Sequence, residues 1–252
     1  MIVYTCITGN HMPIPKQEHI HPNVRYYLFH DYDIEEKHKY KPWKYIKIKT
    51  IKTHFYTQRK YKLLSHFIFK EDCLYIDPKC VLTKDCFNYL TDDYMVGHHP
   101  NYDNYFDELI DWFLMPCITY EEAISITKYL KNLNYDFKKH FSMLATFIYR
   151  KYNKQTIKLN NKWWSLWKTQ KKRDQLFFPP SVYLTKSKVN YKTNCSTLFS
   201  IPIMNYLTFA NPSLHVENLN KLVLLTKEIN KITGQKYTIN PNTTGFRRIR
   251  FA

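Results

Sequence analysis

The fold of this chain is decided by two neighbouring segments, Arg59-Lys60-Tyr61-Lys62-Leu63-Leu64-Ser65-His66 and Leu74-Tyr75-Ile76-Asp77-Pro78-Lys79. The first is a basic segment with helical spacing, and the second is a short apolar run that ends in one carboxylate. Short apolar runs between turn signals predict buried strands, and open α/β sheets bind ligands at the carboxyl ends of their strands. Asp77 is therefore expected at a ligand or metal site, where Arg59 and Lys62 would meet a nucleotide diphosphate. The alternative is that Asp77 caps the following turn and that both cations are solvated.

Strand and helix patterns alternate along the chain and predict an α/β fold. Strands are expected at residues 2–7, 24–30, 43–48, 73–77, 94–97 and 142–149, and helices at residues 55–69, 85–90, 102–114, 120–133, 160–172 and 216–231. We expect a central, mostly parallel sheet flanked by helices in a single main domain over residues 1–185. Residues 186–252 are expected to pack on this domain as a C-terminal appendage.

The composition is strongly basic, with 38 basic and 21 acidic residues and a net charge of +17. Such a balance indicates nucleic acid, an anionic membrane or phosphate-bearing ligands as partners. Only 7 of the basic residues are Arg, which is the usual residue for recognising bases and phosphates. The chain is also rich in Asn, Tyr and Ile, as AT-rich codons would produce. Part of the charge is therefore attributed to genomic bias, and nucleic acid is not the expected partner.

The cysteines and the apolar runs indicate a cytoplasmic protein. None of the six cysteines forms a Cys-x-x-Cys pair or a zinc-binding spacing, so we expect reduced thiols. The first residues lack the basic start of a signal peptide. No run of 18 apolar residues predicts a transmembrane helix. The compartment would be a host cytoplasm if the AT-rich composition reflects a large DNA virus.

Several common site motifs are missing from the sequence. It has no Gly-x-Gly-x-x-Gly and no Gly-x-x-x-x-Gly-Lys-Ser/Thr, which argues against a Rossmann dinucleotide site and a P-loop. It also lacks Gly-x-Ser-x-Gly and His-Glu-x-x-His. The remaining candidates are polar residues at the ends of the expected strands.

Six short motifs follow one another along residues 1–185. They are Val3-Tyr4-Thr5-Cys6-Ile7-Thr8-Gly9-Asn10, Phe29-His30-Asp31, the segment Arg59–His66, Tyr75-Ile76-Asp77, His99-Pro100 ahead of Tyr120-Glu121-Glu122-Ala123, and Trp163-Trp164 ahead of Arg173-Asp174-Gln175-Leu176-Phe177-Phe178. In this order they resemble the TOD/MUCI-type glycosyltransferase-like domain family. The resemblance implies a GT-A-like fold and a role in glycan biosynthesis. It implies transfer of a sugar from a UDP- or GDP-linked donor to a glycan or protein-linked acceptor. The chain departs from the family pattern at Ser65, which replaces a proline, and after Asp77, where no second aspartate completes an Asp-x-Asp pair.

The resemblance also implies roles for individual residues. Asp174 would orient or deprotonate the acceptor hydroxyl, and Gln175 would hydrogen-bond sugar hydroxyls. The nucleotide and its diphosphate would contact Thr5, Thr8, Asn10, Asp31, Arg59 and Lys62. For Asp174 the alternative is a helix cap, and for the two threonines and Asn10 it is loop capping.

A divalent metal, Mn or Mg, would neutralise the leaving diphosphate. Asp77 and His99 are its candidate ligands, while Lys79 could take over part of its charge. His98 and Trp164 would face the acceptor sugar. The alternatives are a surface pair of histidines and a tryptophan in the helix core.

Two other functions stay open at this point. The charge and the 17% aromatic content would also suit a basic nucleic-acid-binding protein, although no known nucleic-acid module is present. The lone Asp77, followed by Lys79, would also suit a catalytically degenerate transferase fold that serves as a binding module.

Overall fold

The computed structural model describes residues 1–10, 12–35, 40–99, 102, 104–139, 141–170, 172–200 and 212–238. Over residues 212–219 it describes the backbone alone. The basic tail around residues 247–250 lies outside this part of the chain.

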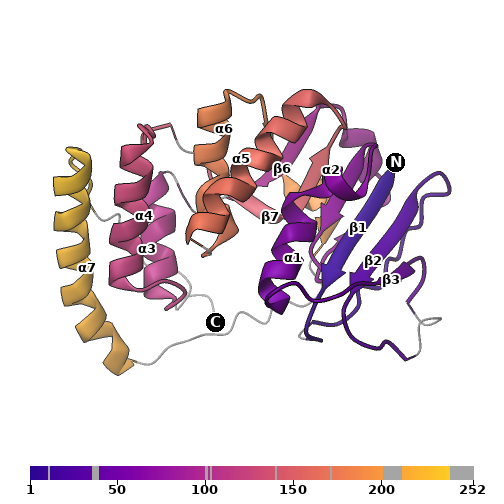
Figure 1. Ribbon diagram of the computed structural model, residues 1–252, viewed down its shortest axis with the longest axis horizontal. Helices are drawn as coiled ribbons and strands as arrows, with labels where there is room; N and C mark the ends of the chain where they lie inside the picture. The colour runs from indigo at the N-terminus through magenta and orange to yellow at the C-terminus, as the bar shows by residue number, and fades with distance from the viewer. Residues whose placement is uncertain are drawn as a thin grey trace.

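A sheet with the strand order β3-β2-β1-β4-β7-β6-β8 forms the centre of the fold (Figure 1). Its strands are β1 (Ile2–Ile7), β2 (Arg25–His30), β3 (Lys44–Lys47), β4 (Cys73–Ile76), β6 (Tyr94–His98), β7 (Met143–Arg150) and β8 (Asn190–Lys192). All neighbouring pairs are parallel except those that β7 makes with β4 and β6. The predicted α/β class and the mostly parallel sheet are confirmed, and the GT-A-like identity stays a prediction.

The strand order reverses at β1. The chain adds β2 and β3 on one side of β1 and then returns to place β4 on the other side. The parallel register pairs Ile2 with Cys73 and Tyr4 with Tyr75, so β1 and β4 end at the same edge of the sheet. A reversal of this kind leaves a crevice outside the carboxyl ends of the two strands, where α/β proteins bind their ligands.

Both faces of the central strands are buried. All six residues of β1 are buried, which explains why its sequence is a continuous apolar run and not an alternating one. Tyr4 and Cys6 point into a core on the helix side, whereas Val3 and Ile7 point into a second core on the opposite face. The strand therefore holds the two cores together.

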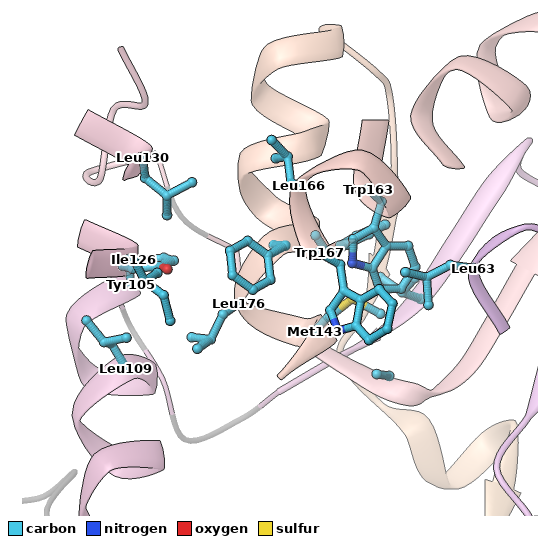
Figure 2. Close-up of a cluster of buried hydrophobic side chains, with 14 of the residues drawn as sticks. Leu63, Tyr105, Leu109, Ile126, Leu130, Met143, Trp163, Leu166, Trp167 and Leu176 are labelled. Atoms are coloured by element: carbon cyan, nitrogen blue, oxygen red, sulfur yellow. The ribbon is translucent and has the colours of Figure 1, made fainter. Parts of the chain in front are cut away.

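The α-helices lie on one side of the sheet, and two of the short 3-10 helices contribute to the core on its opposite face. They are α1 (His54–Leu63), α2 (Ser65–Ile68), α3 (Tyr105–Leu114), α4 (Tyr120–Asn132), α5 (Lys154–Gln170), α6 (Phe178–Thr185) and α7 (Pro212–Thr233), with short 3-10 helices η2 (Cys86–Tyr89), η3 (Asp174–Phe177) and η4 (Cys195–Thr197). Figure 1 shows α1, α5 and α6 over the sheet and α3, α4 and α7 side by side beyond them. Trp163 and Trp167 of α5 pack in the same core as Leu63 of α1 (Figure 2).

Several elements differ from the sequence expectations. The helix expected over residues 55–69 is divided at Leu64, whose φ and ψ of −107° and 46° end α1 before α2 begins. Helix α5 begins earlier than expected because the Asn153 side chain caps its first turn, accepting a hydrogen bond from the Thr156 backbone N–H at 2.8 Å. Helix α6 was not expected after Pro179-Pro180, but proline is tolerated in the first turn of a helix.

The residues after 186 take part in the fold. Strand β8 extends the sheet beside β6, and β9 (Phe199–Ser200) pairs with β5 (Val81–Leu82) in a small antiparallel sheet. Helix α7 buries Leu222, Leu225 and Ile229 in the helix-side core. The domain boundary after residue 185 stays a prediction. Among the described helices, none combines the length and the apolar character needed to cross a membrane.

A buried guanidinium crosses the helix-side core. Arg150, at the end of β7, donates hydrogen bonds to the hydroxyls of Tyr94 at 3.0 Å, Tyr4 at 3.1 Å and Ser65 at 3.4 Å. In the part of the chain that is described, no carboxylate pairs with it. Burial raises the pKa of Tyr4 far enough to keep this hydroxyl neutral, although Arg150 acts in the opposite direction. Neutral hydroxyls therefore solvate Nε and Nη1, whereas Nη2 is buried without a hydrogen-bond partner among the described residues.

Replacing Tyr4 with Phe removes one of these hydroxyls and leaves a buried donor of Arg150 without its acceptor. The free energy of unfolding should fall by about 2 kcal/mol, because a hydrogen bond to a buried charge is lost. Urea unfolding monitored by circular dichroism measures this change. Tyr120→Phe, on the partly exposed first turn of α4, should change stability by less than about 0.5 kcal/mol. Equal effects of the two changes would contradict the role given to the Tyr4 hydroxyl.

Candidate functional site

One carboxylate links three loops at the carboxyl edge of the sheet. Asp31, directly after β2, accepts a hydrogen bond from the Gly9 N–H at 2.8 Å through Oδ1. Its Oδ2 accepts from the Thr50 hydroxyl and from His54 Nδ1, both at 2.6 Å. Burial tends to raise the pKa of Asp31, but the hydrogen bonds from Thr50, Gly9 and His54 outweigh it and lower this pKa. The loop after β1, the loop after β3 and the start of α1 are thus fixed to one side chain.

Gly9 is required by this arrangement. Its φ of +72° lies in the left-handed region that favours glycine. A Cβ at this position would lie 3.1 Å from the ring of His54. The neighbouring Thr8 donates its hydroxyl to the backbone carbonyl of His54 at 2.8 Å. The turn after β1 therefore packs closely on the first residue of α1.

Asp77 follows β4 at the point where the strand order reverses. Its Oδ1 accepts a hydrogen bond from the Tyr75 hydroxyl at 2.8 Å and lies 3.7 Å from Lys62 Nζ. The side chain is 21% exposed. No described residue makes a hydrogen bond or an ion pair with Oδ2. Asp77 is therefore held in place through one oxygen, while the other is left for a ligand.

Two cations on one face of α1 meet a second carboxylate. Arg59 Nε lies 3.1 Å from Asp174 Oδ1, and Lys62 Nζ lies 3.0 Å from Asp174 Oδ2. Arg59 and Lys62 are three residues apart in sequence, which makes them neighbours on a helix surface. The side chains of Lys62 and Asp174 are each only 3% exposed. Asp77, Lys62, Asp174 and Arg59 thus form a continuous ion-paired cluster between β4, α1 and η3.

The cluster keeps Asp174 ionised. Burial alone would raise its pKa, but the positive charges of Arg59 and Lys62 lower it to about 2. A general base works best when its pKa lies near the working pH. With both oxygens ion-paired, this carboxylate is suited to positioning the two cations and is a weak proton acceptor. Its side chain turns toward α1, where both oxygens lie against the two cations.

A second group of candidates meets at the start of β7. Gln175 Nε2 donates a hydrogen bond to the Met143 carbonyl at 2.7 Å, and His98 pairs with Met143 in the β6–β7 ladder. His99 stacks on Tyr102, with ring centroids 4.2 Å apart and an interplanar angle of 16°. Because Asp174 and Gln175 are consecutive, η3 connects this group to the ion-paired cluster.

The structure does not bring the two candidate metal ligands together. Strand β7 lies between β4 and β6. The Asp77 N–H bonds to the Thr146 carbonyl within β7, whereas the His99 N–H bonds to the carbonyl of Ser142, four residues earlier in the chain and just before β7. Across the residues that the structure describes, no group of three or more His, Cys, Asp or Glu side chains is placed to hold a metal ion.

The other predicted contacts occupy varied positions. Thr5 is buried within β1, and Asn10 is exposed at the turn after it with a φ of 49°. Lys79 is exposed beyond Asp77. Trp164 is partly buried and packs against Tyr56, with ring centroids 5.1 Å apart. Of these residues, Asn10 and Lys79 have side chains open to solvent near the strand ends.

Sequence reasoning overlooked three residues of the site. His54 contacts Asp31, Tyr75 contacts Asp77, and Phe55 lies under the guanidinium of Arg59. The period of two in a strand places Tyr75 and Asp77 on the same face, so this pair could have been found. The helical spacing of Phe55 and Arg59 was a similar signal. The contact of His54 depends on the packing of three loops and had no signal in the sequence.

Comparison of the sequence with protein-family models finds no match, and comparison with curated proteins finds none either. The family resemblance therefore rests on the six short motifs alone.

The charge cluster predicts a specific pH dependence. The folded-state pKa of Asp174, about 2, lies below the ordinary value of 3.8. Its contribution to stability is therefore complete above about pH 4 and is lost as the pH falls through 2. Asp174→Asn should lower the free energy of unfolding at pH 7 by about 3 kcal/mol, because Arg59 and the buried Lys62 lose the carboxylate that they share. Urea unfolding at pH 7, 4 and 2.5 measures the difference in free energy of unfolding between the wild-type chain and the variant. This difference should become smaller as the pH falls.

The matched control is Asp93→Asn. Asp93 forms an exposed ion pair with Lys151 at 3.2 Å, and exposed pairs contribute about 0–1 kcal/mol. Its effect should be small at every pH. If the stability difference between the wild-type chain and Asp174→Asn stayed constant from pH 7 to pH 2.5, the destabilisation would not come from the loss of the Asp174 charge.

Proposed function

We propose that this chain is a glycosyltransferase of GT-A-like architecture that transfers a sugar from a nucleotide-diphosphate donor to a hydroxyl acceptor. The observation that carries the proposal is the cluster of Asp77, Lys62, Asp174 and Arg59 at the topological switch point of the sheet. Ligands of α/β sheets bind at this point, and Arg and Lys are the side chains that stabilise phosphate charge. The six family-like motifs include all four of these residues.

The surroundings of the cluster favour an anionic ligand. Residues 37–70 include ten Lys and one Arg but no acidic residue. Five lysines of this segment are exposed just before β3, within it and in the loop that leads to α1, namely Lys41, Lys44, Lys47, Lys49 and Lys52. Of these, Lys47 pairs with Asp33. A charged surface of one sign beside a site raises the local concentration of oppositely charged ligands and their association rate. This field would draw a nucleotide diphosphate toward the carboxyl edge.

The leaving diphosphate gains negative charge as the bond between the sugar and the diphosphate of the donor breaks and the acceptor hydroxyl bonds to the sugar. Arg59 is the more accessible of the two cations and would contact the diphosphate directly. Lys62 lies behind it and holds Asp77 and Asp174 at fixed positions. Preorganised charges of this kind act without reorganisation during the reaction. Asp174 then serves as a positioning residue that aims Arg59.

Asp77 is the residue proposed to contact the donor. Its free Oδ2 and its partial exposure suit a hydrogen bond to a sugar hydroxyl, while Tyr75 and Lys62 fix its orientation. Gln175, His98 and Trp164 would line the acceptor side. Thr8, Asn10 and Asp31 would line the nucleoside side, next to β1 and β2.

The described residues are a poor fit for the divalent metal. Asp77 is the one predicted ligand at the switch point, and its Oδ1 already lies 3.7 Å from the ammonium of Lys62. His99 lies across β7 from it. This geometry favours neutralisation of the leaving diphosphate by Arg59 and Lys62, without a metal ion.

Removing the Asp77 charge should stop transfer while the fold persists. Asp77→Asn should reduce the release of UDP or GDP from a panel of nucleotide sugars by more than about 100-fold, as expected for a lost preorganised contact. A coupled nucleotide-release assay measures the rate, and circular dichroism checks the fold. Asp93→Asn is the control, since its carboxylate is on the surface. An unchanged rate in Asp77→Asn would remove Asp77 from the site.

Chelation distinguishes the two ways of neutralising the diphosphate. If Arg59 and Lys62 do this, the nucleotide-release rate should stay within about twofold after EDTA treatment and desalting, and Arg59→Gln should lower it at least about tenfold. A rate that falls to background with EDTA and returns with Mn²⁺ would instead assign a metal to Asp77.

A second candidate function is nucleotide binding without catalysis. It is favoured by the burial of Lys62 and Asp174 and by the pairing of both cations with carboxylates. UDP or GDP at 100 times its Kd would then stabilise the chain by about 2.7 kcal/mol in thermal unfolding. No nucleotide sugar would be turned over. Turnover of any nucleotide sugar would exclude this alternative.

A further inference from the structure

An exposed aromatic ring stands beside the ion-paired cluster. Phe55 lies in the first turn of α1 and is 45% exposed, although burial of such a ring in the nearby core would be favourable. Exposure alone is not distinctive, because Phe67 of α2 is 72% exposed. Phe55 differs from Phe67 because its ring is held by Arg59 and Trp167 and lies beside the ion-paired cluster.

The ring of Phe55 is fixed by two neighbours. The guanidinium of Arg59 lies over it, 4.4 Å from the ring centroid. The ring of Trp167 lies at a centroid distance of 5.9 Å. Trp167 is itself buried and donates its indole N–H to the Lys172 carbonyl at 2.6 Å. The exposed part of Phe55 is therefore a preorganised apolar surface, which lowers the ordering cost of binding a ligand.

This surface is continuous with the polar site. Arg59 contacts the ring of Phe55 and, through Nε, the carboxylate of Asp174 at 3.1 Å. Lys62 extends the same cluster to Asp77. A ligand that covers Phe55 would thus have the guanidinium of Arg59 at its edge, with Asp174 and Lys62 buried behind it.

We infer that Phe55 is the stacking surface for the pyranose ring of the acceptor, an inference that rests on the proposed function. A pyranose has an apolar face of C–H groups and a polar edge of hydroxyls, which matches the exposed part of an aromatic ring that has the guanidinium of Arg59 beside it. Small-molecule sites combine aromatic surfaces with a few placed polar groups in this way. Phe55 also lies on the α5 side of the cluster, next to Trp167, and α5 carries the proposed acceptor residue Trp164.

Variants of Phe55 test this role by separating acceptor from donor. With methyl glycosides of glucose, galactose and mannose as acceptors, Phe55→Ala should raise the acceptor KM about tenfold, the loss expected for one aromatic stacking contact. The donor KM should change less than about twofold, because Arg59 keeps its ion pair with Asp174 when the ring of Phe55 is removed. Phe55→Leu keeps apolar packing on Trp167 and should show the same loss, whereas Phe55→Tyr should retain the wild-type KM. Phe67→Ala is the matched control, because Figure 1 places α2 beside the start of β1, at the opposite edge of the sheet.

The outcomes separate this inference from the proposed function. An acceptor KM that is unchanged in both Phe55→Ala and Phe55→Leu, in a wild-type enzyme that releases nucleotide from its donor, overturns the stacking role alone. A rise in donor KM equal to the rise in acceptor KM would assign the ring to the nucleobase and also overturn it. A wild-type chain that neither binds nor turns over any nucleotide sugar would overturn the proposed function and the inference together.

Discussion

The pairing of Asp174 with Arg59 and Lys62 is the interaction on which the rest of the site depends. It joins η3 to α1, and through Lys62 it joins α1 to the end of β4. Burying charges such as those of Lys62 and Asp174 is costly, and such clusters often stabilise a fold less than apolar residues of the same size would. Its benefit is positional, because each charge fixes the orientation of the next. The site therefore depends on a contact that a purely stabilising core would not contain.

The sequence correctly predicted the strands that have a distinct local pattern of apolar residues. The continuous apolar runs of β1 and β4 gave both strands within about one residue, because burial on both faces leaves no polar positions. Asp77 at the end of β4 followed from the same pattern. The meeting of Asp174 with Arg59 did not, because nothing in two distant segments specifies their contact. The family-like motifs assigned these residues to one site, but they did not indicate that the carboxylate would be paired.

The remaining differences between the predictions and the structure concern features that local sequence patterns specify weakly or do not specify. His99 and Asp77 both follow strands that end at the same edge, which made a shared metal site plausible. The antiparallel strand β7 lies between them, and strand order cannot be read from local periodicity. Strands β5, β8 and β9 are too short to show an alternating pattern. Helix α5 was placed late because its first turn is polar and its cap, Asn153, is a single side chain.

Asp31 has a mechanical consequence for the edge where the ligand is proposed to bind. Its two oxygens connect the turn after β1, the segment before α1 and the first residue of α1. A displacement of any one of them would stretch short hydrogen bonds to the other two, so the three should move as one body. Selectivity on this side would then come from the shape of a rigid surface, and slow loop closure would not limit the rate of ligand entry.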